Sequence, residues 1–301
     1  MTEIYGTLGP KCSDPETLFA MFGAGMTGVR LNLSHMGLEE AAGQIASLHA
    51  GAERAGRKAR LLIDMQGPEL RIGVLREPVL LTDGDRVELG GAGIPMPEQV
   101  LSLLRPGQEI LLDDGKLRLS VCTSGHGRVQ AEVLRGGVLR SRKSIALPGL
   151  KIHPPTMTEQ DRRNILLAKQ YGVTGVMQPF VRDRKDPETV REALDFAGGK
   201  GIRIFAKIEN LEGEQNLDSI LQAADEIVIA RGDLGNAMPL WELPRIQMEI
   251  AKKCRAAGKP FMVVTQMLAS MEHSPVPTRA EVSDIFHAVY HGAASVMVTG
   301  E

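Results

Sequence analysis

The sequence is poor in the residues that mark several classes of protein. Its 301 residues include three cysteines and one tryptophan, and aromatic residues make up only 4%. Cys12, Cys122 and Cys254 are far apart and odd in number, which argues against a disulfide framework and favours a reducing compartment. No run approaches the ~20 apolar residues that span a bilayer, and no basic stretch leads into an apolar signal region. We therefore expect a cytoplasmic protein that does not enter membranes.

An excess of charge of one sign is also lacking. The 35 basic and 37 acidic residues are interspersed and give a formal net charge of -2. This balance argues against a broad field that would attract nucleic acid or an anionic membrane, so small polar ligands are the expected partners. Neither a Walker A motif nor a dinucleotide-binding fingerprint is present, so any phosphate recognition must use another geometry.

What the sequence does contain is a regular alternation of short aliphatic runs and longer amphipathic segments, which predicts βα units around a parallel sheet. Asp14-Pro15-Glu16 precedes one such segment, and Thr158 with Asp161 predicts a capping box before another. Glycines that read as helix C-caps precede the next strands at Gly25, Gly56, Gly172, Gly258 and Gly292. Eight strands are expected, and hence a (β/α)8 TIM barrel, at residues 4–8, 28–33, 59–65, 175–181, 202–209, 226–231, 260–267 and 295–301.

Residues 70–152 interrupt this alternation. They are rich in glycine and alternate Val or Leu with polar residues, which predicts a small inserted β-barrel domain that serves as a lid. The predicted domains are therefore barrel residues 1–69 with strands one to three, the inserted domain at 70–152, and barrel residues 153–301 with strands four to eight. The eighth strand runs to the last residue, so we expect the last barrel helix to be missing; either the sequence is truncated or another chain covers that face. A second copy could bury the apolar surface left open, so a homodimer is a further expectation.

Polar residues gather where these strands end, which is the end of a parallel barrel that carries function. Lys207 and Glu209 alternate in one expected strand, so their side chains lean to the same side. Glu209 and Asp233, at the ends of neighbouring strands, could hold Mg²⁺, which prefers few protein ligands. The alternative is a structural salt bridge from these carboxylates to Lys207 or Arg231. Charged loop residues are common at any single strand end, but six strand ends show the pattern here.

The same residues resemble the pyruvate kinase family. The resemblance covers nearly the whole chain and rests on TLGP at 7–10, GVRLNLSH at 28–35, LIDMQGPELRIG at 62–73, LLDDG at 111–115, LPG at 147–149, PFVR at 179–182, AKIEN at 206–210, IARGDLG at 229–235, TQMLASM at 265–271, PTRAEVSD at 277–284 and TGE at 299–301. It implies glycolytic phosphoryl transfer from phosphoenolpyruvate to ADP, followed by protonation of the enolate to pyruvate.

The resemblance also implies residue roles. Lys207 and Arg30 would neutralise the transferring phosphoryl group, and Glu209 and Asp233 would hold Mg²⁺ or Mn²⁺. Backbone N–H groups of Gly232 and Asp233, with the Thr265 hydroxyl, would bind the substrate carboxylate, and Thr265 would lie on the proton path. A further set of oxygen ligands would bind K⁺: Asn32, Ser34, Asp64 and the carbonyl of Met65.

Nucleotide contacts are implied for Pro10, Arg30 and His35, and for Lys143 of the inserted domain. Arg71 would reach the substrate phosphate or groups bound to the metal when that domain closes. Closure would exclude water, which competes with ADP for the phosphoryl group. Glu69 matches the form of the motif that the resemblance associates with K⁺ dependence.

Several positions depart from the family pattern. Met65-Gln66 replaces the usual Thr-Lys, Pro179 replaces a serine and Thr299 replaces the serine of the last motif. We also expect the C-terminal regulatory domain of the family to be missing. Effector control through that domain is therefore not expected. Two other readings stay open: a metal-dependent lyase or aldolase that acts through a pyruvate enolate, and a non-catalytic or diverged paralogue.

Overall fold

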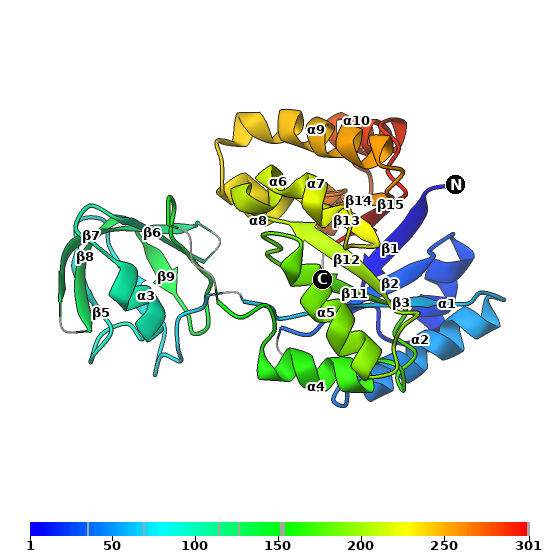
Figure 1. Ribbon diagram of the computed structural model, residues 1–301, viewed down its shortest axis with the longest axis horizontal. Coiled ribbons are helices and arrows are strands. Elements are labelled where there is room, and N and C mark those ends of the chain that lie inside the picture. The colour runs from blue at the N-terminus through cyan, green and yellow to red at the C-terminus, as the bar shows by residue number, and fades with distance from the viewer. Residues whose placement is uncertain (35, 69, 114, 126, 151–153, 300–301) are drawn as a thin grey trace. The chain divides into compact units, whose positions relative to one another are not determined.

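The computed structural model describes residues 1–34, 36–68, 70–113, 115–125, 127–150 and 154–299. The chain forms two compact units (Figure 1). One comprises Met1–Pro68 and Pro155–Glu301, and the other comprises Glu69–Pro154.

The first unit is a closed barrel of eight parallel strands, which confirms the predicted fold class. All eight expected strands are present. In chain order they are β1 (Glu3–Thr7), β2 (Gly28–Asn32), β3 (Arg60–Asp64), β11 (Gly175–Gln178), β12 (Arg203–Ile208), β13 (Glu226–Ala230), β14 (Phe261–Val264) and β15 (Ser295–Val298). The ring closes where β1 pairs with β15, with Glu3 opposite Ser295.

Helices surround these strands on the outside (Figure 1). They are α1 (Pro15–Gly23), α2 (Ala42–Arg54), α4 (Glu159–Ala168), α5 (Lys185–Phe196), α6 (Leu211–Gln215), α7 (Leu217–Ile220), α8 (Arg231–Asn236), α9 (Leu243–Ala256) and α10 (Arg279–Tyr290), with short 3₁₀ turns at Leu240–Glu242 and Ala269–Glu272. The expected start signals are confirmed, because the Asp14 carboxylate caps α1 and Thr158 with Asp161 forms a capping box on α4. All five expected C-cap glycines have positive φ.

Large side chains fill the inside of the barrel. Tyr5 and Phe205 are 1% exposed and pack with aliphatic and methionine side chains from other strands. Gly175 makes room for them, since a Cβ there would lie 2.5 Å from the Phe205 ring. Two further apolar clusters lie between the strands and the surrounding helices. The barrel is therefore a packed core and not a pore.

At the N-terminal end of the strands, buried polar contacts tie the barrel together. Glu226 accepts hydrogen bonds from the Ser295 hydroxyl at 2.7 Å and from Arg203 at 2.8 Å. Burial raises the pKa of Glu226, although both partners act in the opposite direction. These contacts join β12, β13 and β15, so this end of the barrel contributes stability.

The strand expected at 295–301 stops at Val298, most other strand ends differ from the expectation by one residue, and three further ends differ for an identifiable reason. The strand at 175–181 stops at Gln178, because Pro179 has no N–H to donate and Phe180 has a φ of 51°. The strand at 260–267 stops at Val264, because Thr265 has a φ of 77°. Arg231 was expected to end a strand and instead begins helix α8.

The second unit contains β4 (Val79–Leu81), β5 (Arg86–Leu89), α3 (Glu98–Leu103), β6 (Glu109–Leu112), β7 (Leu117–Gly125), β8 (Arg128–Arg135), β9 (Gly137–Leu139) and β10 (Ile145–Ala146). Its strands make an antiparallel five-stranded sheet in the order β10-β6-β7-β8-β5 and a two-stranded sheet, β4-β9. The two sheets share one apolar core. Among the described residues the expected small barrel is thus two sheets, and the helix α3 was not anticipated.

Two outward-facing side chains of the barrel strands are more exposed than the rest. Ile4 on β1 is 43% exposed and Val298 on β15 is 36% exposed, whereas outward residues of the other strands, such as Val29, Ile63 and Ile229, are buried. The apolar surface that the sequence predicted beside the eighth strand is therefore present on the described residues.

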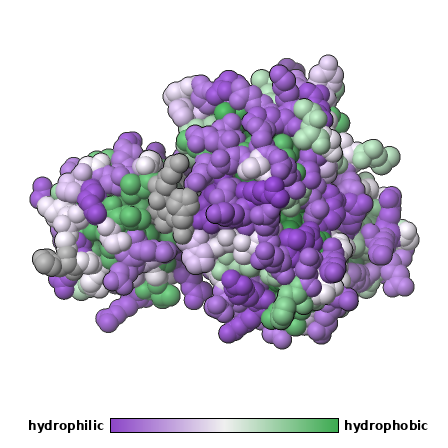
Figure 2. Space-filling view, viewed as in Figure 1, coloured by the Kyte–Doolittle hydropathy of each residue, from purple (hydrophilic) through white to green (hydrophobic). Residues whose placement is uncertain are grey.

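The surface elsewhere is mainly hydrophilic on the face that Figure 2 shows, with small separate apolar patches. Within the described ranges, no helix combines the length and the hydropathy needed to cross a bilayer.

Asp161 joins the two points where the barrel chain leaves for the inserted unit and returns. Its carboxylate accepts hydrogen bonds from the N–H groups of Gln66 at 2.9 Å and Gly67 at 3.0 Å. It also accepts the N–H of Thr158 at 2.9 Å and its hydroxyl at 2.8 Å. Asp161 is fully buried, so one carboxylate both caps α4 and fixes the end of the segment that follows β3.

Replacing Asp161 with alanine should therefore destabilise the barrel strongly. Four hydrogen-bond donors lose a charged acceptor, and three of them are backbone N–H groups, of which that of Gly67 is buried, so we expect the free energy of unfolding to fall by about 2–4 kcal/mol. Urea denaturation followed by circular dichroism measures this change. Glu159→Ala, an exposed change in the same helical turn, is the control, and an equal loss in both variants would contradict the assigned role.

Candidate active site

A buried cluster of charges lies at the C-terminal ends of the barrel strands. Asp64, at the end of β3, is 3% exposed. One of its oxygens, Oδ2, is 2.8 Å from Arg30 Nε, and both oxygens are 3.4 Å from Lys207 Nζ. Arg30 also donates to the Thr7 hydroxyl at 3.2 Å. A single carboxylate thus lies between two cations that come from β2 and β12.

Lys207 is shared between two carboxylates. Its ammonium is 2.8 Å from Glu209 Oε1, in addition to its contact with Asp64. Burial alone would lower the pKa of Lys207, but the attraction of Asp64 and Glu209 outweighs burial, so its pKa is raised. Lys207 is therefore a permanent cation at neutral pH. The expectation that Lys207 and Glu209 lean to the same side agrees with this ion pair.

Glu209 is held between opposing influences. Burial raises its pKa to about 7, with Lys207 acting against the shift and the nearby charge of Asp233 adding to it. The second oxygen, Oε2, accepts the backbone N–H of Phe180 at 2.8 Å. Asp233 is therefore near enough for its charge to act on Glu209. A cation between them would relieve this repulsion, so this pair suits a divalent metal.

Pro179 and Phe180 shape the wall beside Glu209. A Cβ at Gly67 would lie 2.3 Å from Pro179 Cγ, so the proline packs directly on the turn after β3. Phe180 is left-handed, with a φ of 51°, and this conformation accompanies the hydrogen bond from its N–H to Glu209. Pro179, which departs from the family pattern, therefore packs within the site.

Thr265 lies against Gly232. A Cβ at Gly232 would be 3.2 Å from Thr265 Cγ2 and 3.6 Å from its hydroxyl oxygen. Gly232 and Asp233 stand in the first turn of α8. The three residues expected to bind a carboxylate are therefore neighbours.

Oxygen atoms also meet at the ends of β2 and β3. The Asn32 side-chain oxygen accepts the hydroxyl of Ser34 at 2.5 Å and its N–H at 3.1 Å. Asn32 pairs in register with Asp64, and Met65 follows directly. Hard oxygen donors from these residues suit an alkali cation such as K⁺.

The remaining expected site residues are distributed as follows. Pro10 lies in the loop that connects β1 to α1, at the same end of the barrel. Arg71 and Lys143 belong to the inserted unit. The backbone of Arg71 forms an isolated antiparallel β-bridge with Ser144, and Lys143 Nζ is 2.8 Å from Asp113 Oδ1. His35 and Glu69 fall outside the described residues. The roles of all five stay predictions.

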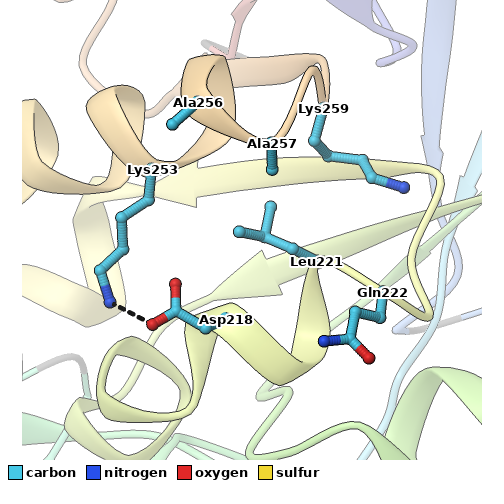
Figure 3. A pocket seen from close by; sticks show the side chains of 7 residues that line it. All are labelled: Asp218, Leu221, Gln222, Lys253, Ala256, Ala257 and Lys259. Carbon is cyan, nitrogen blue, oxygen red and sulfur yellow. Dashed lines mark hydrogen bonds and ion pairs between the residues drawn. The ribbon is translucent and has the colours of Figure 1, made fainter.

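A separate pocket has a volume of about 670 Å³, and none of the cluster residues lines it; Figure 3 shows its lining side chains. It is lined by residues of α7, α9 and the segments that follow them. Its lysines are already engaged, because Lys253 pairs with Asp218 at 3.0 Å and Lys259 donates to the Ala224 carbonyl at 2.6 Å. The charge cluster at the strand ends, and not this pocket, is the candidate site.

Comparison with known proteins decides the family. A family model described as the pyruvate kinase barrel domain matches residues 1–301. The chain belongs to the pyruvate kinase family. It is 39% identical to the pyruvate kinase of Geobacillus stearothermophilus over 311 residues, with 100% of this chain and 53% of that protein covered. It is also 39% identical to the pyruvate kinase of Methylorubrum extorquens and 36% identical to that of Chlamydia pneumoniae, with 64% of each relative covered.

The chain thus spans about half to two thirds of the length of these pyruvate kinases. The family explains why charged residues recur at the strand ends.

Sequence reasoning missed three contributors to the site. Thr7 and Asp284 lie inside motifs that resemble pyruvate kinase, yet neither was assigned a role. Asp284 binds the Arg231 guanidinium through both oxygens, at 2.7 and 2.8 Å. The third contributor is the Phe180 N–H, which no sequence pattern marks because it depends on backbone conformation.

Removal of the Asp64 charge should destabilise the protein. Asp64→Asn leaves Arg30 and Lys207 buried with one carboxylate fewer between them, and we expect the free energy of unfolding to fall by about 3–5 kcal/mol. Urea denaturation at neutral pH measures this change. Asp218→Asn removes an exposed partner of Lys253 and should change stability by less than about 1 kcal/mol. Equal effects in both variants would show that the cluster does not depend on Asp64.

Proposed function

We propose that this chain transfers the phosphoryl group of phosphoenolpyruvate to ADP and gives pyruvate and ATP, with Mg²⁺ or Mn²⁺ and K⁺ as cofactors. The observation that carries the proposal is the buried contact of Lys207 with Asp64 and Glu209, with Arg30 on the other side of Asp64. Membership of the pyruvate kinase family supports it.

In the transfer step, the bond between phosphorus and the enol oxygen breaks, and a β-phosphate oxygen of ADP forms the new bond to phosphorus. Negative charge spreads over the phosphoryl oxygens in a loose transition state. Lys207 and Arg30 would offset this charge. Because Asp64 and Glu209 fix the Lys207 ammonium before substrate binds, little reorganisation is needed.

Glu209 and Asp233 would hold the divalent metal, which when bound would offset charge on the phosphate oxygens. Both carboxylates are close enough to repel each other, and two protein ligands suffice for Mg²⁺. Asn32, Ser34, Asp64 and the Met65 carbonyl would bind K⁺. The cluster contains two cationic side chains, Arg30 and Lys207, and three acidic ones, Asp64, Glu209 and Asp233. Bound cations would balance the additional acidic group.

The pyruvate carboxylate would bind the N–H groups of Gly232 and Asp233 and the Thr265 hydroxyl. Once the phosphoryl group has left, the enolate carbon must gain a proton to give the methyl group of pyruvate. Thr265 is proposed to lie on that proton path. Its contact with Gly232 supports this assignment, because the same residue would touch both the carboxylate and the adjoining carbon.

Pro10, Arg30, His35 and Lys143 are proposed to contact ADP, and Arg71 the substrate phosphate. Lys143 and Arg71 are adjacent in the inserted unit, where the Ile72 N–H donates to the Lys143 carbonyl at 2.9 Å. One movement of that unit would therefore carry both side chains together and exclude water.

A homodimer stays part of this proposal. The partly exposed Ile4 and Val298, with Phe286 at 61% and Tyr290 at 72% exposure on α10, offer apolar surface for a second copy.

Lys207→Met should abolish most of the activity. Loss of a preorganised cation at the phosphoryl group is expected to lower kcat by about 10³-fold. A coupled assay with phosphoenolpyruvate, ADP, Mg²⁺ and K⁺ measures pyruvate formation. Lys253→Met, which removes a lysine from the distant pocket, should retain full activity. No turnover by folded wild-type protein would overturn the proposal.

Glu209→Gln should weaken Mn²⁺ binding by more than about tenfold, because the proposed ligand loses its charge. Titration followed by electron paramagnetic resonance reports free Mn²⁺ directly and does not depend on turnover. Glu242→Gln, which changes an exposed carboxylate, is the control. Unchanged affinity in Glu209→Gln would remove Glu209 from the metal site.

A further inference from the structure

The segment that follows β14 has an unusual backbone. Thr265, Gln266 and Leu268 have φ values of 77°, 56° and 57°, and they account for three of the six left-handed residues other than glycine on the described part of the chain. A branched residue such as threonine rarely adopts this conformation. It persists only where surrounding contacts determine the backbone.

Arg231 supplies those contacts. Its Nε is 3.2 Å from the carbonyl oxygens of both Val264 and Thr265, and its Nη2 is 2.5 Å from the Thr265 carbonyl. Its Nη1 donates to both oxygens of Asp284 on α10. All three guanidinium nitrogens are therefore used within the protein. Arg231 is a cation at a strand end, yet it turns to the backbone and its side chain is only 11% exposed.

The same contacts fix the Thr265 side chain. Arg231 holds the Thr265 carbonyl, and the next residue, Gly232, faces the Thr265 hydroxyl and methyl groups. The strained backbone and the hydroxyl are thus secured by two consecutive residues of α8. A shift of the carbonyl would move the hydroxyl away from Gly232.

Helix α10 anchors the segment at a second point. Glu281 accepts the N–H of Ser270 at 2.7 Å and also its hydroxyl. Glu281 and Asp284 are three residues apart, so both project from the same face of α10. Helix α10 therefore holds the segment in two ways. Glu281 binds Ser270 directly, and Asp284 binds Arg231, which in turn binds the Thr265 carbonyl.

We infer that Arg231 and Asp284 are positioning residues, which keep Thr265, Gln266 and Leu268 left-handed so that the Thr265 hydroxyl stays at Gly232 during proton transfer to the enolate. The inference rests on the proposed function. Neither residue touches substrate in this assignment. Their effect on the reaction passes through Thr265, and this distinguishes them from an ion pair that only adds stability.

The test is a double-mutant cycle on the proton-transfer step. Exchange of the pyruvate methyl protons with deuterium oxide, followed by NMR with Mg²⁺, K⁺ and ATP present, reports this step separately from pyruvate kinase turnover. Asp284→Asn should slow exchange by about 10–100-fold, since small displacements of a reacting group have effects of this size. In a Thr265→Ala background, Asp284→Asn should cause no further loss. Mn²⁺ affinity should stay within about twofold.

Asp225→Asn is the matched control. It removes a charge from the partly exposed ion pair between Asp225 and Arg191, in which Oδ2 and Nη2 are 2.7 Å apart. This pair lies at the opposite end of the strands, so the exchange rate should stay unchanged. Gln266→Gly supplies a rescue, because glycine adopts the left-handed conformation without strain. Added to Asp284→Asn, it should restore exchange at least about threefold.

The outcomes separate the two proposals. If the wild type is active but Asp284→Asn slows exchange by the same factor in the wild-type and Thr265→Ala backgrounds, the positioning role alone is overturned. Failure of the rescue also counts against it. A wild type that shows neither exchange nor turnover in the coupled assay overturns the proposed function, and the positioning role with it. If Asp284→Asn does not fold, Arg231→Lys takes its place in the cycle, because lysine keeps the charge but cannot bind two carbonyls and a carboxylate together.

Discussion

The site depends on the balance of buried charge around Asp64. Two cations and the carboxylate of Glu209 share a region almost without access to water, and none of them would be stable there alone. Barrel closure makes this balance achievable, because β2, β3 and β12 place Arg30, Asp64 and Lys207 at the same height of the ring. The barrel strands therefore bring these charged side chains together, and the ion pairs in turn hold the strand ends in register.

Much of this arrangement could be predicted from the sequence. Aliphatic runs with caps and glycines between them identified all eight strands, because buried parallel strands and helix ends have strong local signals. The alternation of polar residues at one strand end also predicted that Lys207 and Glu209 lean to the same side, in agreement with their ion pair. The pyruvate kinase motifs then identified the family correctly.

What could not be predicted depends on backbone conformation and on pairing between distant segments. Arg231 was expected at the end of a strand, but it begins α8 and binds Asp284, which lies 53 residues further along the chain. Nothing local in either motif marks this pair. Similarly, the left-handed Phe180 and Thr265 shorten two expected strands, because tertiary contacts there outweigh the preference of both residues for extended backbone. Helix α3 is short, and its sequence carries too few turns to show a period.

The four donors gathered by Asp161 have a consequence for how the fold can vary. Both chain crossings into the inserted unit are fastened to the barrel by the same carboxylate, so the ends of the opening stay a few ångströms apart whatever lies between them. Insert length, sequence and even presence can then change without disturbing the third and fourth strands. The inserted unit is then an exchangeable module, which natural variation or protein engineering can replace while the barrel keeps its own geometry.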